Sequence, residues 1–212
     1  MQITTQEVSG FTGAIRGMRE PFESWSKSDS DIDAVKNILC IGPVDMKLDQ
    51  NLLSTDSDSD SKFLRMIHVQ AEITAPAYFI AELATYKVGT TMSSSSLQHI
   101  GANRDFVRND FEIDEHVYSD DYWNFILEQI NSLRRRYKET NNYKYFRQMR
   151  QLIPQSFQYT VMWDANYQTL RNIYKQRIEH PHRLKEWTEC FKGWMETLPY
   201  YEDLIKFTGE NK

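Results

Sequence analysis

The clearest periodic pattern in the sequence is a strict alternation of apolar and polar residues over Ile67–Thr74, in a segment predicted to be a strand from Arg65 to Thr74. The apolar positions are Ile67, Val69, Ala71 and Ile73. Successive side chains of a strand point to opposite faces, so this alternation predicts a β-strand whose four apolar residues face the core. The sequence Ala75-Pro76 then predicts the end of the strand, because proline suits the first turn of a following helix.

Two segments of different character follow that strand. A helix is expected over Ala77–Lys87 and should end at Gly89, and the polar segment Thr90–Gln98 is expected to be a loop. The first 60 residues are rich in acidic and turn-forming residues. There we expect a short helix over Ala34–Cys40 capped by Asp31 or Asp33, a second helix over Val44–Leu53 and an exposed loop over Ser54–Ser61.

The second half has mostly helical spacing. Ser119 followed by Asp120 and Asp121 predicts a helix start, because a serine cap and acidic side chains suit the free N–H groups of a first turn. After a turn at Asn141-Asn142, a second helix is expected to end before Pro154. Two further helices are expected over Ala165–Ile178, with Asp164 as its cap, and over His182–Leu198.

One strand-to-helix unit followed by a helical half indicates an α+β fold. We expect a small mixed or antiparallel sheet packed with long helices, and a helical C-terminal half. The 212 residues correspond to one ordinary domain, so a single domain is expected over residues 1–212.

Composition narrows the class of protein. The net charge of −5 argues against a surface that binds nucleic acid, and no apolar run is long enough to span a membrane. The N-terminus lacks the pattern of a signal peptide. Cys40 and Cys190 are far apart, which predicts buried thiols in a reducing compartment and no metal site. We therefore expect a cytoplasmic protein, and its 13% aromatic residues suit planar ligands or subunit interfaces.

Three features could carry chemistry. The hydroxyl-rich segment Thr90–Ser96 could cradle a phosphate, or be a flexible surface loop. Arg150, one turn before Pro154, could clamp a phosphate or carboxylate, or form a surface ion pair. The spacing i, i+4, i+7, i+11 predicts one shared helix face, which could line a polar pocket or flank a solvated face. The residues with that spacing are Asn166, Leu170, Ile173 and Arg177.

Taken together, these segments resemble the flavin-dependent thymidylate synthases. That family has a strand ending in Ala-Pro, then a helix with an Arg-His-Arg signature, then a loop with serine, asparagine, glutamate, serine and arginine. In this sequence Thr85-Tyr86-Lys87 occupies the signature positions, and Gly89–His99 occupies the place of the loop. The signature therefore departs from the family, since a lysine supplies one point charge and no planar fork.

A second part of the resemblance matches more closely. The family has an arginine just before Leu-Pro, then two asparagines six residues apart, and an arginine five residues further on. This sequence has Arg150 before Ile153-Pro154, and then Asn166, Asn172 and Arg177 at the same spacing.

The resemblance implies roles for individual residues. The residues implied in substrate binding are Arg150, Arg177, Ser95, Ser96, His99 and Glu82. The residues implied in cofactor binding are Lys87, Tyr86, Thr85, Asn166 and Asn172. No catalytic residue is assigned.

The resemblance also implies a reaction and an assembly. A methylene group would pass from methylenetetrahydrofolate to C5 of dUMP, and FAD reduced by NADPH would supply the hydride. Family members are homotetramers whose active sites form between subunits. Three hypotheses follow: an active flavin-dependent pyrimidine methylase, a catalytically silent nucleotide-binding homologue, and an unrelated structural or interaction protein.

Overall fold

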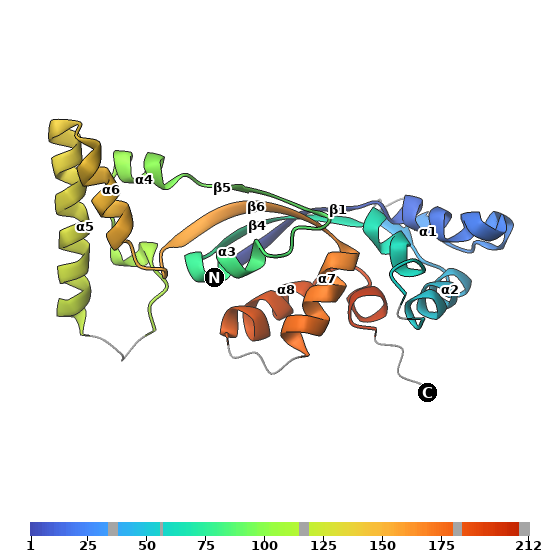
Figure 1. Cartoon of the computed structure of the whole chain (residues 1–212). Coiled ribbons are helices and arrows are strands. Elements are labelled where there is room, and N and C mark those ends of the chain that lie inside the picture. Colours follow the sequence, from blue (N-terminus) through green and yellow to red (C-terminus); the bar gives the residue numbers. More distant parts are fainter. Residues whose placement is uncertain (34–37, 56, 115–118, 180–183, 208–212) are drawn as a thin grey trace. The chain divides into compact units, whose positions relative to one another are not determined.

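The computed structural model describes residues 1–33, 38–55, 57–114, 119–179 and 184–207 (Figure 1). Its main sheet is antiparallel and has four strands, in the order β1, β4, β6, β5. The strands are β1 (Gln2–Ser9), β4 (His68–Pro76), β6 (Gln158–Asn166) and β5 (Thr90–Ser94). Helices make up most of the remaining structure, so the α+β fold class is confirmed.

The chain forms two compact units. The first unit comprises Met1–Gln2, Ile73–Thr85 and Ser93–Val161. The second unit comprises Ile3–Glu72, Tyr86–Met92 and Met162–Lys212. Each strand of the main sheet changes unit part-way along, so both units contain residues of all four strands.

Strand β4 confirms the predicted alternation. Ile67, just before the strand, and the predicted positions within it have no exposed surface, while Gln70 and Glu72 between them are exposed. The strand begins at His68 and not at Arg65, because Arg65 and Met66 belong to a preceding 3₁₀ helix. It ends at Pro76 and not at Thr74, since the backbone stays extended through the buried Ala75 up to the helix.

The predicted loop over Thr90–Gln98 is wrong at both of its ends. Thr90–Ser94 is a strand and not a loop, and Leu97–Asn103 beyond it forms helix α4. Backbone bonds beside the strand explain this: Ser95 N–H donates to Thr160 at 2.9 Å, and Asn166 N–H donates to Gly89 at 3.2 Å. Pairing with β6 therefore orders a segment that has no apolar alternation of its own.

Strand β6 occupies part of a predicted helix. Val161, Trp163 and Ala165 are buried on one face of the strand, and helix α7 (Tyr167–Ile173) begins only after Asn166. The predicted cap Asp164 lies within the strand, and the side chain of Asn166 accepts the Thr169 N–H in its place at 2.9 Å.

Helix α3 (Ala77–Leu83) in the first unit is shorter than predicted. Thr85 after it donates a hydroxyl hydrogen bond to the Glu82 carbonyl at 2.6 Å, which fits a turn. Helices α5 (Asp120–Thr140) and α6 (Tyr143–Leu152) lie side by side and confirm the predicted helices and the turn between them (Figure 1). The core beneath them consists of Leu97, Phe106, Phe111, Trp123, Ile130, Phe146, Met149 and Phe157.

The second unit is built around a 3₁₀ helix, η3 (Ser61–Met66). This helix contacts α1 (Phe11–Arg19), α2 (Pro43–Leu53) and α7, and its Phe63 and Leu64 are almost fully buried. Helix α2 matches the prediction closely, with Pro43 in its first turn.

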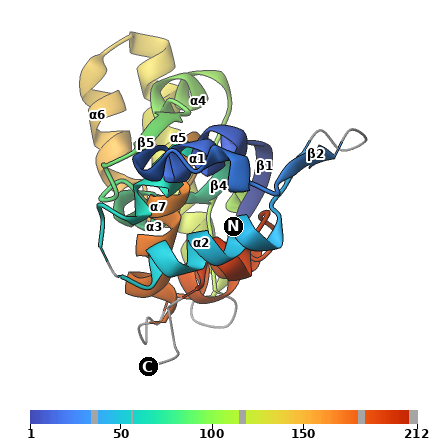
Figure 2. The same cartoon turned by 90° about the vertical axis from the view of Figure 1, so that its right-hand side faces the viewer.

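The predicted helix over Ala34–Cys40 is wrong in its described part. Ile38–Cys40 is strand β3, which pairs antiparallel with β2 (Asp31–Asp33), and Figure 2 shows β2 extending away from α2. Residues 34–37 lie outside the described residues. The carboxylate that caps a helix here is Asp29, which accepts the N–H groups of Val44 and Asp45 at 3.0 and 3.1 Å and so caps α2.

Parts of the predicted C-terminal helices are π-helices. A π-helix over Tyr174–Ile178 follows α7, and another over Glu186–Phe191 precedes the short helix α8 (Lys192–Met195). The predicted start at His182 lies outside the described residues. A third π-helix covers Tyr201–Ile205.

The cysteines differ from the prediction. The two do not form a disulfide, and Cys40 is exposed while Cys190 is half-buried, so neither is a buried thiol. Cys40 lies in the β2–β3 hairpin, which has little core to bury it. None of the described helices combines the length and the apolarity needed to cross a bilayer.

Candidate functional site

Two of the predicted site residues meet in the second unit. The Nε of Arg177 donates a hydrogen bond to the phenol oxygen of Tyr86 at 3.1 Å. That phenol in turn donates to Oε1 of Gln176 at 3.2 Å. A residue implied in substrate binding and one implied in cofactor binding therefore form a single hydrogen-bonded group.

Aromatic rings frame the Arg177 guanidinium. Its central carbon lies 5.9 Å from the centre of the Tyr86 ring and 5.6 Å from that of Trp187, and the two rings pack edge-on at 6.2 Å. Trp187 is fully buried and Tyr86 is half-buried. A planar cation beside an accessible aromatic ring can bind an anion and a flat heterocycle together.

The segment that carries Tyr86 is fixed to the start of α7. Thr90 donates to the Tyr86 carbonyl at 2.5 Å, and Thr169 donates to the Val88 carbonyl at 2.8 Å. Gly89 has a φ of +69°, and a Cβ there would lie 2.0 Å from Nδ2 of Asn166. Only glycine fits this close approach.

The two predicted asparagines have structural partners. Asn166 is buried, and its Oδ1 accepts both the N–H and the hydroxyl of Thr169, at 2.9 and 3.1 Å. Asn172 is half-buried and accepts a bond from Gln168 at 3.3 Å. The cap of α7 therefore uses the side-chain oxygen of Asn166, a residue that the resemblance implied in cofactor binding.

Lys87 and Thr85 lie on either side of Tyr86 in the sequence. Lys87, in the second unit, is exposed and forms no ion pair with a described residue. Thr85 is exposed and belongs to the first unit. None of the three lies on helix α3, where the signature helix was expected.

Three predicted residues surround the start of α4 in the first unit. Ser95 exchanges bonds with Thr160, since its Oγ accepts the Thr160 N–H at 3.3 Å. Ser96 begins α4, and its carbonyl accepts the His99 N–H at 3.0 Å. The side chains of Ser96 and His99 are exposed, so the structure places two of the three in contact with solvent.

The remaining two predicted residues are also in the first unit. Arg150 is exposed near the end of α6, and no described residue forms a hydrogen bond or ion pair with its side chain. Glu82 is half-buried on α3. Arg150 therefore remains available to an anionic ligand.

A histidine–aspartate pair was missed from the sequence. Nδ1 of His68 on β4 lies 3.0 Å from Oδ1 of Asp164 on β6, and both side chains are partly exposed. His68 was not a candidate, and Asp164 was expected to be a helix cap. The alternation of buried Val161, Trp163 and Ala165 was the signal that could have identified the second strand.

A buried charged cluster was also missed. Nε of Arg19 on α1 lies 2.5 Å from Oδ1 of Asp45 on α2, and both side chains are buried. Burial would raise the pKa of Asp45, but hydrogen bonds from Ser28, Ser30 and Arg19 outweigh it and lower the pKa. One turn further along α2, burial and then the Asp45 charge raise the pKa of Asp49 to about 8.

Solved structures with the same fold span almost the whole chain. Thymidylate synthase X (ThyX) from Helicobacter pylori, crystallised with FAD and dUMP, matches with a TM-score of 0.71 and 17% identity over 100% of both chains. The UMP/dUMP methylase PolB from Streptomyces cacaoi, bound to 5-Br dUMP, matches with a TM-score of 0.58 and 13% identity. That match covers 99% of this chain and 93% of PolB.

Sequence comparison gives a different result. No protein-family model and no curated protein matches the sequence. The similarity is therefore one of structure: the chain shares its α+β fold with a flavin-dependent thymidylate synthase and with a UMP/dUMP methylase.

Proposed function

We propose that the protein is a flavin-dependent methylase of a pyrimidine deoxynucleotide, of the type that converts dUMP to dTMP. The observation that carries the proposal is the full-length fold match to a thymidylate synthase crystallised with FAD and dUMP. Arg150, Asn166, Asn172 and Arg177 support it, because they repeat the spacing by which the sequence resembles that family. Methylenetetrahydrofolate and NADPH are the proposed co-substrates.

The proposal gives each arginine a task. A guanidinium can form two parallel hydrogen bonds to a phosphate or to the edge of a pyrimidine. Arg150 is exposed and has no described partner, which suits it to bind a nucleotide. Arg177 is held by Tyr86 and Trp187, so its guanidinium is restrained before a ligand arrives. Ser95, Ser96, His99 and Glu82 remain proposed substrate contacts.

The residues around Tyr86 fit a flavin nucleotide. The half-buried Tyr86 ring can stack against a flat heterocycle, and exposed Lys87 can neutralise one phosphate charge. Bound FAD would supply the hydride for methylation. Thr85, Asn166 and Asn172 are further proposed contacts, through atoms that their present hydrogen bonds leave free.

One observation favours a second candidate, a nucleotide-binding homologue without catalysis. The side-chain oxygen of Asn166 is already used as a helix cap, and the phenol of Tyr86 already accepts a hydrogen bond from Arg177. These internal bonds can replace flavin contacts, in keeping with the departure from the Arg-His-Arg signature.

The visible spectrum of the purified protein, followed by titration with dUMP, separates the two candidates. Flavin absorbance together with dUMP binding, and release of dTMP when methylenetetrahydrofolate and NADPH are added, would support the methylase. A colourless protein that cannot be loaded with FAD but binds dUMP would leave only the silent homologue. Absence of both ligands would refute both candidates.

The proposal includes a homotetramer, with both units acting as one functional domain. Exposed Tyr122 and Phe125 on α5, at 47% and 63% exposure, are aromatic groups suited to a subunit interface. Sedimentation should give a mass near four times the 25.2 kDa of one chain. A single-chain mass at every concentration would contradict the assembly.

A further inference from the structure

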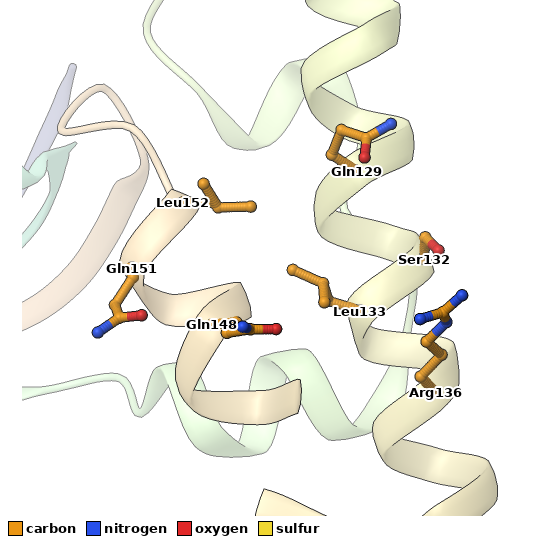
Figure 3. Close-up of a pocket in the computed structure, with 7 residues that line it drawn as sticks. All are labelled: Gln129, Ser132, Leu133, Arg136, Gln148, Gln151 and Leu152. Carbon is orange, nitrogen blue, oxygen red and sulfur yellow. The ribbon is translucent and has the colours of Figure 1, made fainter. Parts of the chain in front are cut away.

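A pocket of about 470 Å³ lies between α5 and α6 of the first unit (Figure 3). Its size is within the usual range of small-molecule sites, roughly 300–1,000 Å³. The residues that line it are Gln129, Ser132, Leu133, Arg136, Gln148, Gln151 and Leu152. None of them belongs to the site proposed above for the nucleotide and the flavin.

Helical spacing explains why these side chains converge. On α5 the lining positions follow i, i+3, i+4 and i+7 from Gln129, and on α6 they follow i, i+3 and i+4 from Gln148. Residues with this spacing lie on one face of a helix. Behind those faces, buried Ile130, Phe146 and Met149 join the two helices in one core, so the pocket walls are held in place.

The lining combines apolar and polar groups. Figure 3 shows Leu133 and Leu152 projecting into the space between the helices, with Gln148 pointing towards α5. No described residue forms a hydrogen bond with the side chains of the three glutamines or of Ser132. Apolar contacts with a few polar groups available for binding are typical of ligand sites.

The charge in the pocket comes from Arg136. Its two neighbours have acidic partners: Arg134 binds Asp105 at 2.7 Å, and Arg135 binds Glu128 at 2.5 Å. Arg136 has no acidic partner among the described residues, and its guanidinium carbon lies 5.8 Å from the Tyr145 ring on α6. The arginine that lines the pocket is therefore the member of this basic run whose charge is not matched by a described carboxylate.

We propose that this pocket binds a small carboxylate whose body carries amide groups, which is the chemistry of an N-acyl amino acid. One guanidinium matches one carboxylate in a paired, two-bond geometry. The glutamine carboxamides both donate and accept, so they match the N–H and C=O of an amide. A phosphate dianion fits less well, because the lining offers a single cation and no helix N-terminus.

The test uses N-acetylglutamine as the probe and N-acetylglutaminamide, which lacks the carboxylate, as its counterpart. Titration of the full chain is followed by NMR at the side-chain amides of Gln129, Gln148 and Gln151. Saturable shifts of these amides are expected with the carboxylate, and binding of the counterpart should be at least about tenfold weaker.

Variants separate the pocket from general charge effects. Arg136→Ala should weaken binding of the carboxylate at least about tenfold, and Gln148→Ala should weaken it from the opposite wall. Arg147→Ala is the matched control, because Arg147 is an exposed arginine on α6 that does not line the pocket. It removes the same charge and should leave binding unchanged.

Several outcomes would overturn the proposal. They are the absence of shifts at the three glutamines up to the solubility of the probe, equal binding of the two probes, and an equal loss in Arg136→Ala and Arg147→Ala. Displacement of the carboxylate by inorganic phosphate at lower concentration would also overturn it, since the pocket would then be a phosphate site. Circular dichroism of each variant confirms that the helices are intact.

Discussion

Arg177 donates a hydrogen bond from Nε to the hydroxyl of Tyr86 at 3.1 Å, although 91 positions separate the two residues in the chain. This bond restrains the Arg177 guanidinium through its Nε atom. It also orients the Tyr86 ring, because the ring and the guanidinium are both restrained by Trp187. A ligand that binds Arg177 is therefore expected to contact Tyr86.

Arg177→Ala should weaken binding of dUMP at least about tenfold and leave the fold intact, because one charged hydrogen-bonding contact contributes about 1.5–3 kcal/mol. Arg150→Ala should have a similar effect. Calorimetric titration of both variants with dUMP measures the change.

The control for this titration is chosen from the structure. Arg134 is only 12% exposed and pairs with Asp105, so its loss would disturb packing and Arg134→Ala is not a suitable control. Arg147→Ala is more suitable, since Arg147 is exposed and forms no described ion pair. If this control binds dUMP as weakly as the other two variants, the assignment of Arg150 and Arg177 is wrong.

Gly89→Ala should lower the free energy of unfolding by about 2–3 kcal/mol. The left-handed backbone at φ +69° is unfavourable for alanine, and the new Cβ would displace the Asn166 cap. Thermal or urea denaturation gives the value. Gly13→Ala is the matched control, because a Cβ at Gly13 meets nothing within 4 Å and α1 should gain up to about 1 kcal/mol. Equal effects of the two changes would contradict this account.

Asp49 should make stability depend on pH. Its pKa is about 8 in the folded chain against an ordinary value of 3.8, so the folded state holds a proton that the unfolded state releases. Stability should therefore fall as pH rises from about 4 to about 8, with a slope of up to about 1.4 kcal/mol per pH unit, and then level off.

Urea denaturation at a series of pH values tests this dependence. Asp49→Asn should remove the slope, because an amide cannot ionise. Asp58→Asn, at a carboxylate that is 83% exposed, should keep it. A slope that survives in Asp49→Asn would mean that another group is responsible.

Asp45→Ala should cost about 3–5 kcal/mol of stability, because it leaves the buried Arg19 guanidinium without its counter-charge. Glu20→Ala breaks the pair between Arg16 and Glu20, whose side chains are more than half exposed, and should cost at most about 1 kcal/mol. Urea denaturation of the two variants gives their unfolding free energies, and the comparison shows whether burial makes an ion pair more important for stability. Similar losses would show that burial is not what makes the Asp45 pair important.

The fold was predictable where the local pattern and the tertiary environment agree. Strand β4 has one fully buried face, so its sequence alternates, and α5 has acidic residues in its first turn and an apolar stripe. Strand β1 lies at an edge of the sheet with six of its eight residues exposed, and so it carries little pattern to recognise. Asp164 and Asn166 in β6 are both residue types that often cap a helix start. Pairing of β6 with β4 keeps Asp164 in the strand, so that Asn166 caps α7.

The candidate site was predictable only in its residue types. Spacing along the chain and the family resemblance picked out Arg177, and the resemblance alone picked out Tyr86, but their hydrogen bond depends on the turn after α3 and on the packing of Trp187. The Asn166 cap and the Gly89 contact likewise depend on segments that are distant in sequence.

The π-helix that carries Arg177 is a place where the chain can lose one residue. The N–H of Glu179 donates to the carbonyl of Tyr174, and this ring encloses one residue more than an α-helical turn. Removal of one residue, such as Lys175, would restore an ordinary α-helical turn. The π-helices over Glu186–Phe191 and Tyr201–Ile205 offer the same tolerance. The C-terminal part of the second unit is therefore where homologous chains are expected to gain or lose single residues.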